Sequence, residues 1–325
     1  MTVFKKLLRN PTSLIGIILL TIFVIIAIGA PWLAPVPENS RDPYMIPRDG
    51  FSTTPQPPSE EHRFGTTEGQ YDIYYGVIWG TRTAFRIGVV ITLITTIAGI
   101  FIGSISGFYG GWVDELLMRG TEIFQAFPFL LAAITMTSVL QTIYGRGEAG
   151  ALIFMAKGLA FMTFGQNPTE NIDPVQLQIL TGMLAIIFFG WMGIARVMRG
   201  NILSVKEFEY ALAAKTIGAN DMRILFRHLL PNAIFPILVI ASMNIGSYVL
   251  TFAALSFLGL GAQRGYADWG QMISFARNWV PSLVEYWYIV VFPGAAIILF
   301  VLAWNLVGDA LRDILDPRLR GSGSV

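Results

Sequence analysis

Six long stretches without a single Asp, Glu, Lys or Arg constrain this chain more than any other feature. A helix needs about 20 apolar residues to cross the roughly 30 Å hydrocarbon core of a bilayer. One such stretch could be a buried helix of a soluble protein, but six together predict an all-α membrane protein with six transmembrane helices. The stretches are Leu14–Leu33, Ile87–Phe108, Ile123–Thr142, Ile179–Ala195, Ala233–Leu258 and Tyr288–Gly308.

Composition agrees with a chain that is surrounded by lipid. Hydrophobic residues make up 54% of the chain and charged residues 13%, against about 25% charged residues in a typical soluble domain. The net charge of +1 gives no reason to expect nucleic-acid binding. The chain has no cysteine, which excludes disulfides and thiol chemistry, and its two histidines, His62 and His228, form no metal-binding motif. We therefore expect no metal site.

Two segments could be mistaken for something else. The first stretch follows Lys5, Lys6 and Arg9 as a secretory signal would. Its apolar run is longer than the usual 7–15 residues of a signal, so we expect an uncleaved signal anchor. The segment Gly150–Phe164 is apolar but has Lys157 in its middle, and as a helix it would reach about 22 Å. We expect it to lie at the membrane interface or within an external loop.

The distribution of Lys and Arg predicts the orientation of the chain. With six spans, thirteen basic residues lie on the side that holds both termini and nine on the longer opposite side. Cytoplasmic loops carry the excess of positive charge, so both termini are expected in the cytoplasm. We divide the chain into the N-terminus with the first helix (1–33), a Pro-rich external loop with its lead-in segment (34–86), a five-helix core (87–320) and a tail (321–325). The core contains an external insertion (141–178) and a cytoplasmic loop (201–232).

The cytoplasmic loop carries signals for two short helices. The motif Ser204-x-x-Glu207 predicts a capping box that starts a helix over Phe208–Ile217. Gly218 suits a left-handed residue at the end of that helix. The second helix is predicted to start at Asn220 or Asp221, to run through Leu230 and to end before Pro231.

The side chains of this helical hairpin suggest two interpretations. Small residues would let another surface approach the backbone, and Phe208 and Ile217 would offer apolar anchors beside basic side chains. The hairpin is then a docking element. Alternatively, it packs on its own helix bundle, and these observations alone do not separate the two. The small residues are Ala211, Ala213, Ala214 and Gly218, and the basic ones are Lys215, Arg223 and Arg227.

The residues from Glu209-Tyr-Ala-Leu-Ala-Ala-Lys-Thr-Ile to Gly218, followed by Arg227-His-Leu-Leu-Pro231, resemble the EAA loop of ABC importer permeases. The resemblance implies that the loop docks into a cleft of an ATPase subunit and transmits its closure. The position of the motif's glutamate is Leu212 here, while Glu207 and Glu209 lie close by. The residues implied in coupling are Glu207, Glu209, Ala213, Ala214, Gly218, Leu230 and Pro231.

Further motifs resemble the C-type permease subunit of the dipeptide, oligopeptide and nickel transporters, which implies the type I ABC importer permease fold. One departure is Gly69-Gln-Tyr-Asp72, where that family usually has Gly-Arg-Asp. The resemblance covers most of Leu14–Arg320 except Gln141–Gln178, which looks like an insertion. The motifs are Phe64-Gly-Thr66, Gly80-Thr-Arg-Thr83, the segment from Gly110 to Arg119, Ala126-Phe-Pro128, the segment from Leu255 to Gly261, and the segment from Gly308 to Arg320.

Two patterns within the predicted spans bear on packing and transport. Asn244, Ser247, Tyr248 and Thr251 fall on one helix face. In lipid such a polar stripe must face protein or water, so it either lines a pathway or forms interhelical hydrogen bonds. The ladder of Gly99, Gly103 and Gly107 permits close helix approach, which we expect within this subunit.

The chain has no Walker A motif and no nucleophile elbow, so we expect no enzymatic activity. The resemblance implies that ATP and Mg²⁺ bind in two ATPase subunits, and that a second homologous permease and an external solute-binding protein complete the importer in the inner membrane. Peptide is the expected substrate, with nickel and oligosaccharides as alternatives. A secondary transporter driven by ions would need a carboxylate within the membrane, and the six stretches contain none. A scaffold without transport is a third interpretation.

Overall fold

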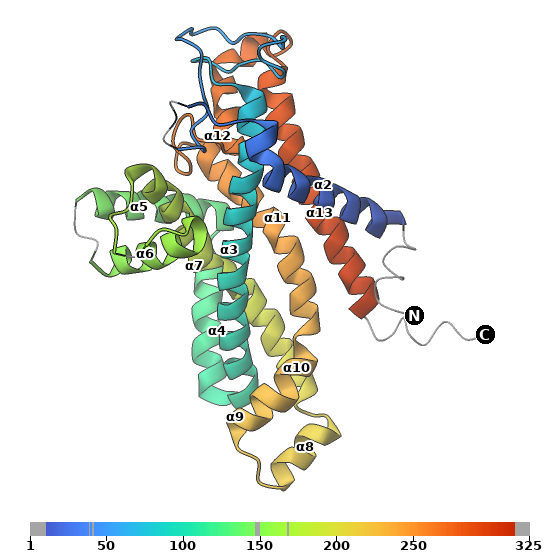
Figure 1. Cartoon of the computed structure of the whole chain (residues 1–325). Helices are drawn as coiled ribbons and strands as arrows, with labels where there is room; N and C mark the ends of the chain where they lie inside the picture. Colours follow the sequence, from blue (N-terminus) through green and yellow to red (C-terminus); the bar gives the residue numbers. More distant parts are fainter. Residues whose placement is uncertain (1–10, 39, 41, 147–149, 168, 316–325) are drawn as a thin grey trace.

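The computed structural model describes residues 11–38, 40, 42–146, 150–167 and 169–315. Its long axis is formed by α3 (Ile73–Tyr109) and α7 (Pro174–Val205), which lie side by side (Figure 1). The predicted tail 321–325, and the basic residues Lys5, Lys6 and Arg9 of the predicted signal anchor, lie outside the described residues.

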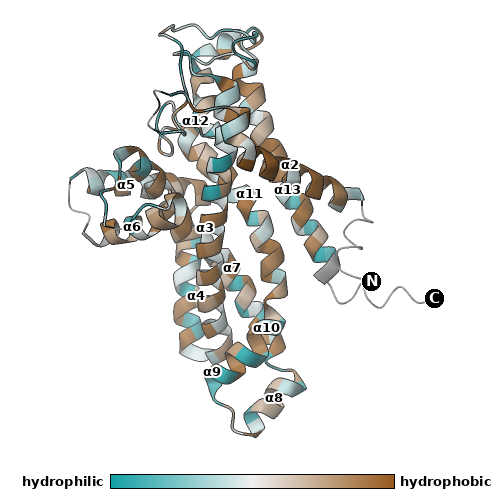
Figure 2. Ribbon diagram, in the orientation of Figure 1, coloured by the Kyte–Doolittle hydropathy of each residue, from teal (hydrophilic) through white to brown (hydrophobic). Residues whose placement is uncertain are grey.

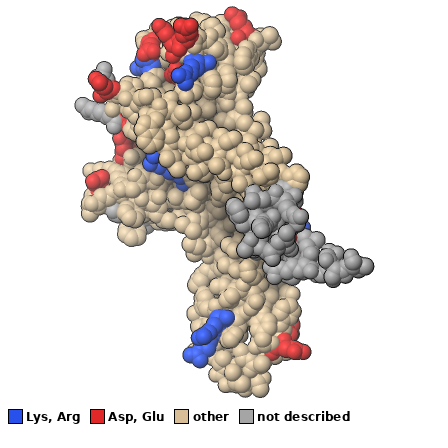
Figure 3. Space-filling view, turned by 45° about the vertical axis from the view of Figure 1, so that its right-hand side comes forward, with Lys and Arg blue, Asp and Glu red and all other residues tan. Residues whose placement is uncertain are grey.

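Five helices of the described chain are long and apolar enough to cross a membrane, and each overlaps a predicted stretch. Besides α3 and α7 they are α2 (Pro11–Leu33), α11 (Phe235–Phe257) and α13 (Tyr288–Leu315). Apolar residues dominate these helices, whereas the loops above them are largely hydrophilic (Figure 2). On the face shown in Figure 3, charged side chains lie at the top, along the left-hand flank and at the bottom of the molecule, and most of the remaining described surface is uncharged. The structure confirms the all-α membrane fold.

The predicted span over Ile123–Thr142 is interrupted by a break and is not one continuous helix. Two helices, α4 (Gly111–Gln125) and α5 (Phe129–Gly145), meet there at an angle of 88°. The break falls at Ala126–Pro128, because a proline has no N–H to donate and its ring clashes with a preceding helical turn. Together the bent pair could count as a sixth span.

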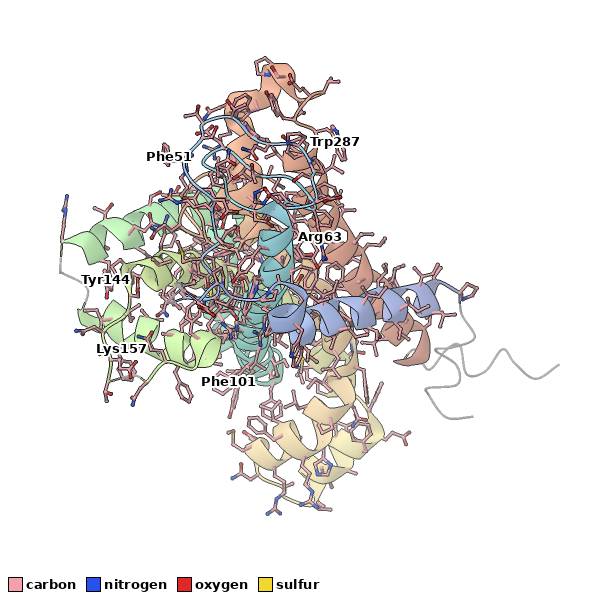
Figure 4. The ribbon with its side chains drawn as sticks, turned by 45° about the horizontal axis from the view of Figure 1, so that its top comes forward. Phe51, Arg63, Phe101, Tyr144, Lys157 and Trp287 are labelled. Carbon is pink, nitrogen blue, oxygen red and sulfur yellow. The ribbon has the colours of Figure 1, made fainter. Side chains whose placement is uncertain are left out.

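Beyond the break, α5 and α6 (Gly150–Phe164) form an arm to one side of the bundle. Tyr144 and Lys157 mark this arm at the left of Figure 4, well away from Trp287, which lies near the top of the view. One face of α6 packs against α7 and α3 through Ala156, Leu159 and Ala160, which are buried. The opposite face is exposed and carries Phe154, Met155, Phe161 and Met162.

The loops between Ala34 and Asp72 form a head in which the described residues include no helix, as the prolines predicted. This head packs on α12 (Trp269–Ser274) and on the 3₁₀ helix η2 (Phe275–Ser282). Glu68 ties it to η2, since its carboxylate accepts hydrogen bonds from Arg264 at 3.0 Å, Asn278 at 2.8 Å and Trp279 at 3.3 Å. Burial opposes ionisation of Glu68, but these hydrogen bonds outweigh it and lower the pKa of the carboxyl.

The glycine ladder of α3 packs within the chain, as predicted. Side chains at Gly99, Gly103 and Gly107 would collide with the backbone and β-carbons of α7. The carbonyl of Gly107 accepts a hydrogen bond from Lys206 Nζ at 3.2 Å, just beyond the end of α7. Close contact without intervening side chains makes α3 and α7 one packing unit.

Candidate functional site

A cavity of about 730 Å³ lies where three parts of the bundle meet. Its walls are α11, the middle of α7 and the break between α4 and α5. The lining is a mixture of aromatic, aliphatic and uncharged polar side chains, and no charged residue is among those that line it. Helix breaks in membrane proteins persist where the freed backbone faces protein or a cavity. The 88° bend of α4 and α5 therefore places irregular backbone along the wall of this groove.

The predicted polar stripe of α11 lies along the groove. Asn244, Ser247, Tyr248 and Thr251 all line it. Ser247 is exposed and Thr251 half-buried, and their hydroxyls donate to carbonyls one turn earlier in α11, at 3.4 and 2.9 Å. These hydroxyls remain available as hydrogen-bond acceptors toward the groove.

Tyr248 has a different environment from its neighbours in the stripe. Its ring is buried, and its hydroxyl donates to the carbonyl of Gly190 in α7 at 3.0 Å. Asn244 Nδ2 in turn donates to the tyrosine oxygen at 3.4 Å. A side chain at Gly190 would collide with this hydroxyl. Tyr248 thus forms the interhelical hydrogen bond that was one of the two interpretations of the stripe, while Ser247 and Thr251 face the groove.

The other two walls of the groove were not predicted from the sequence. Gln125, Phe127 and Pro128 line the groove from the helix break, and Gly190 and Gly193 line it from α7. At Gly193 a β-carbon would meet no atom within 4 Å, so this position opens onto free space. Pro128 within an apolar stretch was the available signal for the break, whereas the contribution of α7 arises from tertiary packing alone.

The second candidate site is the loop 201–232, predicted to be cytoplasmic, which forms a hairpin of short helices. They are α8 (Glu209–Thr216), α9 (Asp221–Arg223), the π-helix η1 (Ile224–Leu229) and α10 (Leu230–Ala233). The predicted capping box is wrong: Ser204 lies within α7, and α8 begins at Glu209 after Phe208, without a side-chain cap. The helix α7 continues past Ser204 because Ile202 and Val205 are buried in the core of the hairpin.

The turn between the helices follows the sequence closely. Gly218 has a φ of +79°, which confirms the left-handed residue. Its N–H donates to Lys215 O at 3.0 Å, and the N–H of Ala219 donates to Ala214 O at 3.1 Å, the two bonds of a Schellman motif. Asn220 then caps α9 by accepting a hydrogen bond from Met222 N at 3.0 Å.

The predicted end of the second helix before Pro231 is wrong. The chain stays helical to Ala233, with Pro231 in the first turn of α10. The π-helix before it, Ile224–Leu229, changes the hydrogen-bonding pattern at this point. A proline is tolerated in a first turn, where its missing N–H costs no helical hydrogen bond.

The hairpin has a buried and an exposed face. Ala211 and Ala214 are buried against Ile202, Ile224 and Leu229, so their small size serves packing within the chain. The opposite face is exposed and includes Ala213, Gly218 and both glutamates, Glu207 and Glu209. Leu230 is half-buried against the hairpin core and Pro231 is exposed. Large apolar side chains on the exposed face are Phe208, Leu212, Ile217, Met222 and Phe226, with Ile217 84% exposed.

Exposed apolar side chains at the end of a helix bundle, clustered on one hairpin and mixed with Lys215, Arg223 and Arg227, are typical of a protein-binding surface. Within the described residues no group of three or more His, Asp or Glu side chains could hold a metal ion. The chain thus combines apolar spans, a groove open on one side and an exposed hairpin.

These features define a multi-pass membrane protein with a groove between its helices. The family model for the inner-membrane component of binding-protein-dependent transport systems matches residues 99–321, and that for the N-terminal transmembrane domain of oligopeptide transport permease C matches residues 2–58. The chain belongs to this family of inner-membrane transport components.

Curated relatives match the chain over nearly its whole length. It is 35% identical to a dipeptide transport system permease protein of Alkalihalophilus pseudofirmus, over 98% of this chain and 89% of the relative. It is 34% identical to an oligopeptide transport system permease protein of Bacillus subtilis, over 96% and 87%. A glutathione transport system permease protein of Pectobacterium atrosepticum is 32% identical, over 98% and 90%. The chain is accordingly a permease subunit of an ABC importer, located in the inner membrane.

Proposed function

We propose that this chain forms one half of a translocation pathway for peptides. The observation that carries the proposal is the groove: α7, α11 and the helix break enclose about 730 Å³ on one side and leave the other side open. A second, homologous permease facing the groove would complete the pathway. Closed two-fold pairing is the commonest arrangement of protein subunits in soluble oligomers.

Peptide is the substrate that the lining favours. Peptides differ in side chain but share a backbone of hydrogen-bond donors and acceptors. A wall without charged residues, with hydroxyls at Ser247 and Thr251 and an amide at Asn244, can bond that backbone without selecting one side-chain charge. The relatives named for dipeptides, oligopeptides and glutathione support this choice. Nickel and oligosaccharides are the alternative substrates.

ATP binding and hydrolysis are assigned to two partner subunits, which would supply the nucleotide and Mg²⁺ sites. They would dock on the exposed face of the α8–α10 hairpin, with both termini of this chain on the same, cytoplasmic side. An external solute-binding protein would deliver the peptide at the opposite end. Closure of the ATPase subunits would then move the hairpin, and the pathway would open alternately to the two sides.

The test is co-purification from detergent-solubilised membranes of cells that express the whole transporter. Wild type is compared with Ile217→Asp, which places a charge on the exposed hairpin face where the side chain is 84% exposed. We expect an ATPase to co-purify with wild type and to be lost in the variant. The matched control is Val284→Asp, an equally drastic change at a side chain that is 94% exposed and lies beside η2, far from the hairpin in sequence and structure.

Peptide uptake into proteoliposomes completes the test. Wild type should take up peptide when the binding protein and ATP are present, and Ile217→Asp should not. If no ATPase accompanies the folded wild-type chain, or if uptake proceeds without ATP, the proposed function is wrong.

A further inference from the structure

One carboxylate joins three helices near the hairpin. Asp114, in the first turn of α4, accepts hydrogen bonds from Arg199 of α7 at both of its oxygens, Nε to Oδ1 and Nη2 to Oδ2, each at 2.5 Å. Ser106 of α3 donates a further hydrogen bond to Asp114 Oδ1. We call these three side chains the α4 clamp. The paired guanidinium–carboxylate geometry is the most directional ion pair that proteins form.

The clamp fastens the N-terminal half of α4, which follows α3 after a single residue, to α7. Met118 and Thr121 are the buried residues of this helix. Much of the rest faces outward, with Trp112 75%, Leu116 65% and Ile123 63% exposed. By contrast, α3 and α7 are fused by the glycine ladder, whose members lie against α7 atoms. The helix α4 is therefore a thinly packed rod that is fastened at one end to a rigid pair.

The other end of the same rod forms part of the groove. Four residues that line the cavity, Phe124, Gln125, Ala126 and Phe127, lie at the C-terminal end of α4 and in the break that follows. A helix of fifteen residues spans about 22 Å. A shift or rotation of α4 at Asp114 is thus carried to this wall of the groove.

Arg199 places the clamp next to the hairpin as well. It lies six residues before Val205, where α7 ends and the chain passes into the hairpin. Neighbouring residues of α7, Met198 and Ile202, are fully buried in the core that also holds Ala211 and Ala214 of α8. The hairpin and this part of α7 therefore share one packed core, so a hairpin that moved would displace α7 at the level of Arg199.

From this geometry we propose that the α4 clamp is a positioning device for transport, through which movement of the hairpin repositions the groove wall at the α4–α5 break. Asp114 and Arg199 touch neither substrate nor nucleotide, and act by holding α4 in register with α7. The proposal rests on the proposed function, since it requires that the hairpin be moved by an ATPase. Without the clamp, ATP hydrolysis should continue, but the groove wall at the α4–α5 break should no longer move with the hairpin.

The experiment uses the whole transporter in proteoliposomes, with peptide uptake and ATP hydrolysis measured on the same preparation. Asp114→Asn removes the ion pair, and Arg199→Lys keeps the charge but loses the paired hydrogen bonds. For both variants we expect the peptide transported per ATP hydrolysed to fall by about fivefold or more, the lower range of allosteric coupling energies. The double variant Asp114→Arg with Arg199→Asp should recover part of that ratio.

The matched control is Glu115→Gln on the same helix. Glu115 and Arg119 form a pair at 4.0 Å in which both side chains are 71% exposed, so its loss should leave the ratio unchanged. The proposal would be overturned if Arg199→Lys transported as much peptide per ATP as wild type. It would also be overturned if both clamp variants lost ATP hydrolysis and peptide uptake to the same extent. Failure of the wild type to couple ATP to uptake would instead overturn the proposed function.

Discussion

Gly103 of α3 lies against the backbone carbonyl of Ala195 in α7, so closely that even a methyl group has no room between them. Gly99 and Gly107, one turn to either side, meet α7 in the same way. Lipid offers no hydrophobic driving force for helix association, so stability must come from such backbone contact. The two longest helices among the described residues are thus held together by glycines, which have no side chain beyond a hydrogen atom.

The first prediction concerns this contact. Gly103→Ala should destabilise the subunit by about 1–3 kcal/mol, the usual cost of overpacking, because the obstacle is backbone and cannot rotate away. The measurement is the midpoint of thermal unfolding in detergent. Gly200→Ala in α7 is the control, since a β-carbon there meets no atom within 4 Å. It should match or exceed wild type, because alanine is the better helix former. Equal midpoints for the two variants would contradict the close packing.

How far the sequence could predict the fold is clearest in α3. The length of the stretch without charged residues predicted a spanning helix. It did not predict which face of the helix packs inward, since residues that face lipid and residues that face protein are both apolar. Ile91 is completely buried and Leu93, two residues later, is 48% exposed. The glycine ladder was the one local signal for the inward face. The start of α3 at Ile73 was missed, because Asp72 caps a helix that continues outside the apolar stretch.

The candidate site was predictable in part for similar reasons. The stripe of α11 follows from helical spacing, and the turn at Gly218 from backbone chemistry. The capping box at Ser204 was a local signal that burial of Ile202 and Val205 overrode. The groove itself joins Gln125, Gly190 and Ser247 from three distant segments, and no local pattern reports such an arrangement.

The second prediction separates lining from packing in the α11 stripe. Ser247→Leu should narrow the groove and reduce peptide uptake by about tenfold, equivalent to about 1.4 kcal/mol in a transport barrier. Assembly with the ATPase and thermal stability should remain as in wild type. Leu250, which is 50% exposed and does not line the groove, supplies the control Leu250→Ile. Uptake that is unchanged in Ser247→Leu would show that substrate passes elsewhere.

The third prediction concerns the tyrosine of the same stripe. Tyr248→Phe removes the hydrogen bond to Gly190 O but keeps the buried ring. We expect the loss of this interhelical hydrogen bond to cost about 1 kcal/mol in stability. The midpoint of thermal unfolding should fall while peptide selectivity stays the same. A change in selectivity without a change in the midpoint would mean that Tyr248 contacts substrate rather than α7.

The fourth prediction follows from Asp268, at the start of α12. Its carboxylate accepts a hydrogen bond from Gln271 N at 2.8 Å, but burial raises the pKa of Asp268 to about 6. Because this value lies above that of an unfolded aspartate, about 3.9, the group favours the folded state when it is protonated. That contribution is lost as the pH rises from about 4 through 6, and ionisation costs about 3 kcal/mol above this range.

Asp268→Asn tests this directly, since asparagine caps a helix but does not ionise. The variant should unfold at a higher temperature than wild type at pH 8, and the advantage should disappear toward pH 4. Glu68→Gln provides a comparison of opposite sign, because hydrogen bonds lower the pKa of Glu68 despite its burial. Loss of the Glu68 carboxylate should lower the stability of the head at neutral pH, and should lower it less in acid. A pH-independent difference between Asp268→Asn and wild type would refute the buried charge.

The last prediction concerns the shape of the hairpin turn. A β-carbon at Gly218 would meet no atom within 4 Å, but the φ of +79° is strained for residues other than glycine. Asparagine tolerates this conformation, whereas a β-branched residue does not. Gly218→Val should therefore open the Schellman turn and reduce co-purification of the ATPase. Gly218→Asn adds a polar side chain where glycine has none, but it should keep both the turn and the co-purification. If asparagine abolishes binding as completely as valine, the space beside Gly218 is filled by the partner, and contact rather than backbone conformation governs docking.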